Sequence, residues 1–458
     1  MIHRASVLLA LCMVLGNVTS SLADRPNVLM ICIDDLNDWV GCLGGHPNAN
    51  TPQIDSLARR GRLFTNAHCV VPVCSPSRVS IMSGVHATTH GSYELGPDYR
   101  TIPKLKDVPT MQAYFKQHGY RTFAGGKVLH HGFTGHLADG IDVNLGDRRG
   151  GPRPKEVMNW TKGAWDWGGF PETDEQMFDF QLAKSAAAAL QLKHDQPFFI
   201  SVGFFRPHVP MFVPPKWFEM FAEDQITLPN VPDDDMDDVP PNFQEMPMIA
   251  PTFREIRKAG KWRSLVQAYL ANTSFVDRCV GSVIDSLDGS PYRDNTLVVL
   301  WSDHGFHLGE KHQIAKRMLW EESTRVPLIV AGPGISPGSS CAEAVSLLDI
   351  YPTLVDLCQL PENPHLEGES LRMQLDHATA PRHRPVLTSS YYGNHAVRSR
   401  DWRYIRYKDG AEELYDHRND PNEFHNLAND PKFADQKAGL AKWIPAVVAD
   451  EVWKKNSK

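Results

Sequence analysis

The chain has 458 residues, a formal net charge of −7, 42% hydrophobic residues and 22% charged residues. This length suffices for one large α/β domain and a smaller one. The composition is that of an ordinary globular protein and excludes a disordered or collagen-like chain. The negative net charge argues against a nucleic-acid-binding protein, although part of this charge comes from the acidic run at 233–238.

Residues 1–23 are predicted to form a secretory signal peptide. A weakly basic start precedes a short apolar core from Val7 to Leu15, and Ser21-Leu22-Ala23 has the small-x-small form of a cleavage site. The alternative is a membrane anchor, but this core is far shorter than the ~20 residues that span a bilayer. We therefore expect an exported protein without stable membrane insertion. Its compartment would be periplasmic or extracellular, or lysosome-like in a eukaryote.

Four continuous apolar runs each end in polar or charged residues. Such runs are typical of strands that are buried on both faces, as in parallel sheets. Because ligands bind beyond the carboxyl ends of strands in open α/β sheets, we expect the four ends to meet in one cleft. The runs are Asn27–Ile33 before Asp34-Asp35, Tyr120–Ala124 before Gly125-Gly126-Lys127, Pro197–Gly203 before Arg206-Pro207-His208, and Thr296–Trp301 before Ser302-Asp303-His304-Gly305.

Helical patterns separate these runs, and the alternation predicts an α/β fold. Two long irregular stretches, Gly132–Asp174 and Leu228–Pro251, interrupt the alternation and are expected to form walls of a substrate pocket. The expected helices are Thr51–Arg62, Val108–His118, Asp174–Lys193 and Trp262–Leu287.

The pattern changes to short strands from about Arg384. Strands are expected at 385–388, 395–398, 402–407 and 413–415, followed by a helix near Pro431–Trp453. This pattern predicts a small antiparallel sheet plus helix packed on the main domain. We assign residues 24–375 to a catalytic domain and 376–458 to a C-terminal subdomain.

The segment Cys74-Ser75-Pro76-Ser77-Arg78 follows a kinked apolar run. Ser75 and Pro76 are expected to form the cap and first turn of a helix that runs toward Gly84. Unpaired N–H groups and the helix dipole make such a start an anion-binding position, and Arg78 lies one turn further on. From the residues alone, Cys74 could form a disulfide with Cys69, act as a thiolate nucleophile or be a modification site. The eight cysteines are scattered, which indicates neither a zinc cage nor a disulfide-dense scaffold.

Two acidic pairs at strand ends are candidate metal ligands. Asp34-Asp35 and Asp303-His304 supply three carboxylates and an imidazole. Oxygen-rich sets of this kind suit calcium or magnesium better than zinc. Each pair alone could be a helix cap or a turn, but two pairs beside an anion-binding helix start favour one shared metal site.

Four further residues are candidates for binding and proton transfer. Lys127 and His130 follow two glycines, which permit a tight turn and a close backbone approach. His208 lies in a rigid proline-flanked segment after a buried strand. Lys316 follows a glycine-containing loop and could instead be a solvated lysine.

In this order along the chain, the motifs resemble those of the type I sulfatases. The segments concerned are Asp34-Asp35, Cys74-Ser75-Pro76-Ser77-Arg78, Gly126-Lys127-Val128-Leu129-His130, Arg206-Pro207-His208 and Ser302-Asp303-His304-Gly305. Leu308-Gly309-Glu310 with Ala315-Lys316 is similar to the iduronate-2-sulfatase branch. The resemblance implies an alkaline phosphatase-like fold, which has a large mixed sheet flanked by helices and a smaller C-terminal antiparallel sheet plus helix.

The resemblance also implies a role for each residue. Cys74 would be oxidised to formylglycine by a formylglycine-generating enzyme, and one calcium ion would be bound by that group with Asp34, Asp35, Asp303 and His304. Arg78 and Lys127 would stabilise the hydrated aldehyde and the sulfate charge. His130 would be the base that releases sulfate, while His208 and Lys316 would hold the ester and assist the leaving oxygen.

The sequence thus predicts a sulfatase that acts on a sulfated sugar or polysaccharide, and the branch resemblance suggests a 2-O-sulfated uronate. The basic loop from Arg148-Arg149 to Arg153-Pro154-Lys155 could bind a uronate carboxylate or a second sulfate, or be solvated. One alternative is a phosphodiesterase or phosphonate hydrolase of the same superfamily. Another is a non-catalytic sugar-binding protein with unmodified Cys74. The oligomeric state is left open.

Overall fold

The computed structural model describes residues 25–96, 98–130, 140–147, 150–160, 165–241 and 251–452. The expected signal peptide, and Arg148 and Arg149 of the basic loop, lie outside the described residues. Among the helices that are described, none combines the length and the apolar character that crossing a membrane requires.

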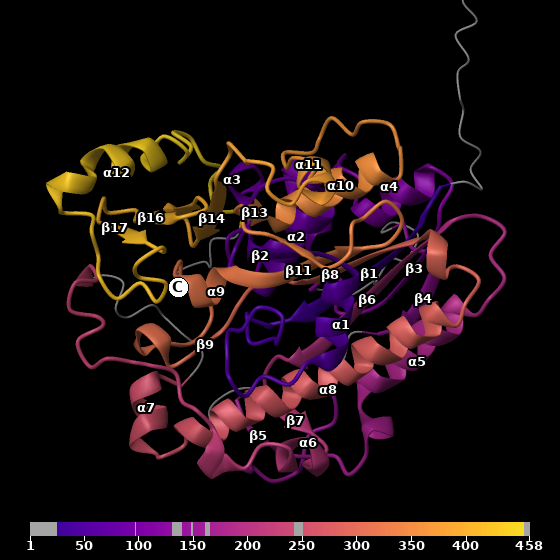
Figure 1. Ribbon diagram of the computed structural model, residues 1–458, viewed down its shortest axis with the longest axis horizontal. Helices are drawn as coiled ribbons and strands as arrows, with labels where there is room; N and C mark the ends of the chain where they lie inside the picture. Colours follow the sequence, from indigo (N-terminus) through magenta and orange to yellow (C-terminus); the bar gives the residue numbers. More distant parts are fainter. Residues whose placement is uncertain are drawn as a thin grey trace, which may run out of the picture.

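A mixed sheet of nine strands forms the centre of the molecule, in the order β12-β2-β11-β8-β1-β6-β3-β4, with β13 paired to β2 (Figure 1). The four adjacent strands β8, β1, β6 and β3 are parallel, whereas β11 is antiparallel to both neighbours. These four are the predicted strands, so their carboxyl ends lie at one edge. The strands are β1 (Asn27–Asp34), β2 (Gly61–His68), β3 (Arg121–Gly126), β4 (Val143–Gly146), β6 (Phe198–Pro207), β8 (Thr296–Ser302), β11 (Arg325–Ala331), β12 (Ser339–Cys341) and β13 (Val345–Ser346).

Helices cover both faces of the sheet. Alternate residues of a strand point to opposite sides, so the complete burial of β1 shows that both sides are covered. Leu29 and Ile31 belong to one apolar core, which includes α1, α5 and α8, and Val28 and Met30 belong to a second, which includes α2, α4 and α10. The two helical layers lie below and above the sheet in Figure 1. The helices are α1 (Pro52–Arg60), α5 (Phe178–Leu190) and α8 (Trp262–Asp288), and α2 (Cys74–Ser83), α4 (Met111–Gln117) and α10 (Ile350–Leu357).

Two central strands were not predicted from the sequence. The helix expected to reach Arg62 ends at Arg60, and Gly61 begins β2, whose polar residues hide its strand character. Strand β11 contains Pro327, which lacks an N–H for the ladder. The β11–β2 register shifts between Val326 and Leu328, so a local irregularity accommodates the proline.

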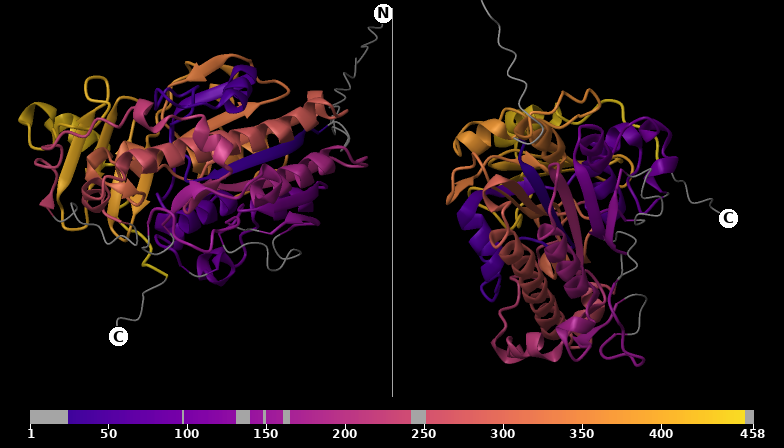
Figure 2. Two further views of the ribbon diagram at one scale, coloured as in Figure 1. Left: turned by 90° about the horizontal axis from the view of Figure 1, so that it is seen from below. Right: turned by 90° about the vertical axis from the view of Figure 1, so that its right-hand side faces the viewer.

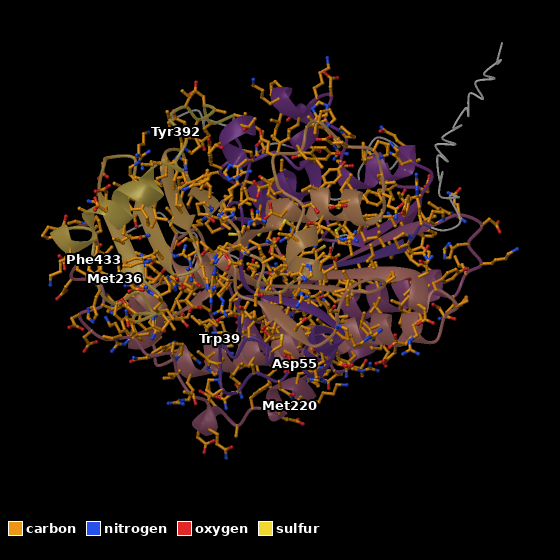
Figure 3. The ribbon with its side chains drawn as sticks, turned by 45° about the horizontal axis from the view of Figure 1, so that its top comes forward. Trp39, Asp55, Met220, Met236, Tyr392 and Phe433 are labelled. Carbon is orange, nitrogen blue, oxygen red and sulfur yellow. The ribbon has the colours of Figure 1, made fainter. Side chains whose placement is uncertain are left out.

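The C-terminal part forms the predicted antiparallel sheet, in the sequential order β14-β15-β16-β17. This sheet lies at one end of the layered main domain (Figure 2, left). Met236 and Phe433, which are labelled in Figure 3, mark the same end. The final helix, α12 (Ala434–Ala441), is shorter than expected, because Pro445 disfavours helical backbone before it. The strands are β14 (Val386–Ser390), β15 (Asn394–Arg398), β16 (Trp402–Arg406) and β17 (Glu412–Asp416). The domain boundary at 375/376 stays a prediction.

Buried ion pairs join this sheet to the catalytic part. Arg403 on β16 donates to Glu423, to Glu321 of α9 (Glu321–Thr324) and, at 2.8 Å, to the carbonyl oxygen of Leu319. The Arg403 side chain is fully buried. Because buried charges need partners, the loss of Arg403 would leave Glu321 with Arg398, and Glu423 with His417, as the remaining ion-pair partners.

We expect Arg403→Ala to lower the free energy of unfolding by about 3–5 kcal/mol, because it leaves Glu321 and Glu423 buried without this cation. The matched control is Arg400→Ala, whose side chain is 62% exposed and lies 3.5 Å from Glu343. That control should cost less than about 1 kcal/mol. Urea denaturation followed by circular dichroism measures both, and similar losses would contradict a structural role for the buried network.

Candidate active site

The predicted strand ends meet at the start of α2. Asp34 ends β1, Lys127 follows β3, and Asp303 follows β8. Arg78 of α2 connects them: its Nε donates to Asp303 at 2.8 Å, its Nη2 to Asp34 at 3.4 Å, and its Nη1 to the carbonyl oxygen of Lys127. All ten predicted site residues are described, and contacts link them into one cluster.

Cys74 is the first residue of α2 and is buried. The helix therefore begins one residue before the expected cap, with Val73 as its N-cap in extended backbone. Cys74 Sγ lies 3.1 Å from Lys316 Nζ, 3.2 Å from His304 Nε2 and 3.8 Å from Asp35 Oδ1. Cys69 and Cys74 are both free cysteines, so the structure does not contain the disulfide considered from the sequence.

Asp35 has a constrained backbone and one free oxygen. Its φ of 63° is in the left-handed region, which is rare for a residue other than glycine. Tyr269 of α8 donates to its carbonyl oxygen at 2.7 Å, and its own N–H donates to Asp303 at 3.1 Å. The buried atom Asp35 Oδ2 has no hydrogen-bond partner among the described residues, and His208 Nε2 lies 3.9 Å from it.

This donor set fits a hard cation. The ligand atoms of Asp34, Cys74, Asp303 and His304 all lie within 4.8 Å of one another, and so do those of Asp34, Asp35, Cys74 and His208. The Asp35 oxygen that lacks a hydrogen bond indicates a cation at this position, since buried carboxylate oxygens normally have a partner. Carboxylate oxygens are the ligands that calcium and magnesium prefer.

Fixed cations balance the carboxylates. Lys127 pairs with Asp34, and Lys316 lies 2.5 Å from Asp35. Although burial opposes the shift, Lys127, Lys316 and His304 hold the pKa of Cys74 well below its usual range. Three carboxylates thus face Arg78 and two lysines, so an added divalent cation would leave the site positive and suited to an anion.

His130 and His208 border the same sulfur and carboxylate cluster. A side-chain hydrogen bond from His130 contributes to the lowered pKa of Cys74. A Cβ on Gly126, whose φ is +69°, would collide with the carbonyl oxygen of Gly203 on β6. This glycine therefore permits the close strand approach that sets the position of Lys127. His208 keeps 18% of its side chain exposed and is one of the groups that face the outside of the cluster.

Sequence reasoning missed residues that hold the site in place. Tyr269 fixes Asp35 from α8, and Ser77 Oγ donates to the carbonyl oxygen of Asp303 at 2.6 Å. Arg206 had no assigned role, and its Nη1 donates to the carbonyl oxygen of His208 at 3.3 Å. Tyr269 lies in the middle of an amphipathic helix pattern, where an inward tyrosine gives no functional signal.

Comparisons with known proteins identify the family. The Sulfatase family model matches residues 26–360, and the model of the N-sulphoglucosamine sulphohydrolase C-terminal region matches residues 309–449. A sulfatase of Formosa agariphila is 39% identical over 444 residues, covering 92% of this chain and 87% of that protein. Choline-sulfatase of Rhizobium meliloti is 31% identical (89% and 83% covered), and iduronate 2-sulfatase of Homo sapiens is 28% identical (81% and 76% covered).

Solved structures of known proteins have a similar fold. Phosphonate monoester hydrolase of Agrobacterium radiobacter has a TM-score of 0.76 at 20% identity, with 91% of this chain and 94% of that one covered. A 2-O GAG sulfatase has a TM-score of 0.70 at 26% identity, with 92% of each chain covered. The mixed sheet and these likenesses confirm the alkaline phosphatase-like fold. With a family model that spans most of its length, this chain belongs to the sulfatase family of sulfuric ester hydrolases.

Proposed function

We propose that this protein is an exported sulfatase that hydrolyses a sulfate ester of a sulfated sugar, with a 2-O-sulfated uronate as the preferred unit. The observation that carries this proposal is the position of Cys74. It begins a buried helix, and its sulfur contacts Lys316 and His304 beside the carboxylate cluster. The predicted export would place the enzyme in the periplasm or outside the cell.

Asp34, Asp35, Asp303 and His304 would hold one calcium ion, together with an oxygen on residue 74. That oxygen would come from formylglycine, made from Cys74 by a formylglycine-generating enzyme during maturation. When present, the hydrated aldehyde and the ion supply an activated hydroxyl that can attack sulfur and a route for releasing sulfate. The unpartnered Asp35 Oδ2 supports this assignment of the ion.

The cations of the site would act in different ways. Lys127 and Lys316 would neutralise the oxygens of the sulfuryl group as charge develops on them. Arg78 was expected to stabilise the sulfate charge directly. Its donors are instead engaged with Asp303, Asp34 and the carbonyl oxygen of Lys127, so we assign it the positioning of the metal-binding carboxylates.

Two histidines would handle protons on either side of residue 74. His130, in hydrogen-bond contact with Cys74, would accept the proton when sulfate is released. His208 is partly exposed and lies 3.9 Å from Asp35, where it would bind the ester and assist the leaving oxygen with Lys316. Lys316 Nζ is close enough to Cys74 to serve both the bound sulfate and the departing alcohol.

The choice of substrate rests on the relatives and on charge. The names of two relatives, an iduronate 2-sulfatase and a 2-O GAG sulfatase, support a 2-O-sulfated sugar. Choline-sulfatase is a competing precedent, but choline sulfate is a zwitterion that carries a quaternary ammonium group. The pocket whose wall includes Pro210, two residues from His208, contains Arg153 and Lys155 together with Glu156 and Asp166, and its two cations support an anionic sugar.

Two other functions remain as alternatives to be tested. A phosphodiesterase or phosphonate hydrolase activity is suggested by the fold likeness alone. The metal-ligand groups around Cys74 share that residue and Asp34, which favours one ion and the two lysines acting on a monoanionic sulfate ester. A non-catalytic sugar-binding protein would keep Cys74 as a thiol.

Added calcium should stabilise the wild-type protein, because an ion that binds only the folded state adds about 2.7 kcal/mol at a hundredfold excess over Kd. Thermal denaturation with and without CaCl2, after chelator treatment, measures this effect. Asp35→Asn should abolish the calcium-dependent shift. Asp195→Asn, a control with an 87% exposed side chain, should retain it. No shift in the wild-type protein would argue against the proposed cation.

Protein made in a host with a formylglycine-generating enzyme should carry an aldehyde at position 74. Peptide mass spectrometry, with hydrazide labelling of the aldehyde, detects the conversion. Cys74→Ser should abolish turnover, because its single hydroxyl offers no comparable route for releasing sulfate from residue 74. An unconverted thiol in such a host would favour the sugar-binding alternative.

A panel of defined sulfated disaccharides, with a phosphonate monoester and choline sulfate as competitors, tests the reaction and the substrate together. The highest kcat/KM is expected on the 2-O-sulfated uronate. Activity confined to sulfates at other positions would remove the 2-O assignment. Preference for the phosphonate ester would replace the sulfatase proposal itself.

A further inference from the structure

A pocket lies beside the segment that carries His208. Its volume is about 160 Å³, and its wall includes Arg153, Lys155, Trp160 and Pro210. Pro210 is two residues from His208, and two residues span at most ~7 Å of chain. The wall of this pocket therefore borders the segment that carries His208, one of the groups proposed to hold the scissile ester.

The wall of the pocket carries hydrogen-bond donors that have no partner among the residues that the structure describes. Arg153 and Lys155 are exposed, and neither pairs with a carboxylate in the parts of the chain that the structure describes. The Nε1 atom of Trp160 is buried and has no hydrogen-bond partner among the described residues. Buried donors are normally satisfied, so the indole N–H of Trp160 points to an acceptor supplied from outside the described residues. The two exposed cations in the same wall would favour an anionic acceptor.

The acidic residue deepest in this wall does not cancel these donors. Asp166 accepts hydrogen bonds from four backbone N–H groups, at 2.8–3.1 Å, which belong to Met158, Asn159, Trp160 and Trp167. Both of its oxygens are therefore occupied in holding the loop together. Glu156, the other acidic residue of the wall, is exposed to solvent. Glu156 therefore adds a carboxylate to the exposed part of the wall, and Arg153, Lys155 and the Trp160 indole are the donors that a ligand can meet.

Arg206 connects this pocket with the catalytic segment. It is only 1% exposed, and its buried Nη2 has no partner among the described residues. Its Nε donates to the carbonyl oxygen of Phe212, which also lines the pocket, and its Nη1 donates to that of His208. Burial, together with Arg153, lowers the pKa of Arg206 to about 10 against the effect of Asp179. The guanidinium groups of Arg153 and Arg206 repel each other, and an anion between or beside them would offset that repulsion.

We propose that this pocket is a second anion subsite, in which Arg153, Lys155 and the Trp160 indole bind a carboxylate or a second sulfate of the sugar substrate. Arg206 acts through His208 as a positioning residue, because it holds the His208 carbonyl and faces the same loop. The inference rests on the proposed sulfatase function, which it deepens by requiring a second negative charge on the substrate.

The test compares two substrates in wild-type protein and in Arg153→Ala. One is a 2-O-sulfated uronate disaccharide, and the other is 4-nitrophenyl sulfate, which has no second anion. The ratio of their kcat/KM values should fall roughly tenfold in the variant, the usual effect of losing a charge-assisted hydrogen bond. Arg153→Lys should recover part of the loss. Lys193→Ala, a control with an 89% exposed side chain, should leave the ratio unchanged.

Two further substrates separate the sources of the anion. A carboxyl-reduced disaccharide that loses the effect of Arg153 identifies the carboxylate, whereas a disaccharide without its second sulfate that loses the effect identifies that sulfate. Parallel losses on the disaccharide and on 4-nitrophenyl sulfate, or an unchanged ratio in a folded Arg153→Ala protein, would overturn the proposal.

A binding measurement separates this proposal from the proposed function. Calorimetric titration of a uronate disaccharide that lacks only the 2-O-sulfate, and so keeps its carboxylate and its second sulfate, into wild-type protein and Arg153→Ala needs no turnover. Weaker binding to the variant, in a protein that hydrolyses no sulfate ester, would support the anion subsite while removing the sulfatase proposal. Equal binding alongside normal sulfatase activity would remove the subsite alone.

Discussion

A buried guanidinium holds the centre of this protein together. Arg78 is fully buried and donates to carboxylates or carbonyls that come from β1, β8 and the end of β3. Taking such charges out of water is costly unless each is paired with good geometry. The strand ends must therefore keep their relative positions, and Cys74, one turn earlier on the same helix, is fixed against them. Cys74 and the carboxylates proposed to bind the ion thus share one structural constraint.

The site has a closed side and an open side. Asp34, Asp303 and His304 are buried, and Arg78 forms ion pairs with both carboxylates. His208 remains partly exposed, and residues 153–160 form a pocket with Pro210 and Phe212, whose wall includes the donors Arg153, Lys155 and Trp160. The side that would hold the ion is therefore dry and rigid, while the side that would receive the sugar keeps unsatisfied hydrogen-bonding groups. This asymmetry suits a reaction on one ester of a larger anionic molecule.

The C-terminal sheet also contributes to the site, through the segment that contains Lys316. The next residue, Arg317, donates its backbone N–H to Pro72 at 3.0 Å and accepts at its carbonyl oxygen from Ser390 of β14. A few residues later, Glu321 enters the ion-pair network with Arg403 and Arg398. The segment that carries Lys316 is thus held by contacts with both parts of the chain, and it connects the small sheet with the surroundings of Cys74.

The sequence by itself determined the four parallel strands, the helices between them and the residues that collect at their ends. Long apolar runs that stop at charged residues are a local signal, and parallel strands bring their carboxyl ends together. It did not reveal β2 and β11, because polar residues and Pro327 mask their strand character until neighbouring strands and helices bury them. Only the tertiary structure decided that Arg78 orders carboxylates, that Tyr269 holds Asp35, and that Arg153 and Trp160 face a pocket beside His208. Those roles depend on which buried donors find partners, and partners as distant in the chain as Arg78 and Asp303, or Tyr269 and Asp35, cannot be read from local sequence patterns.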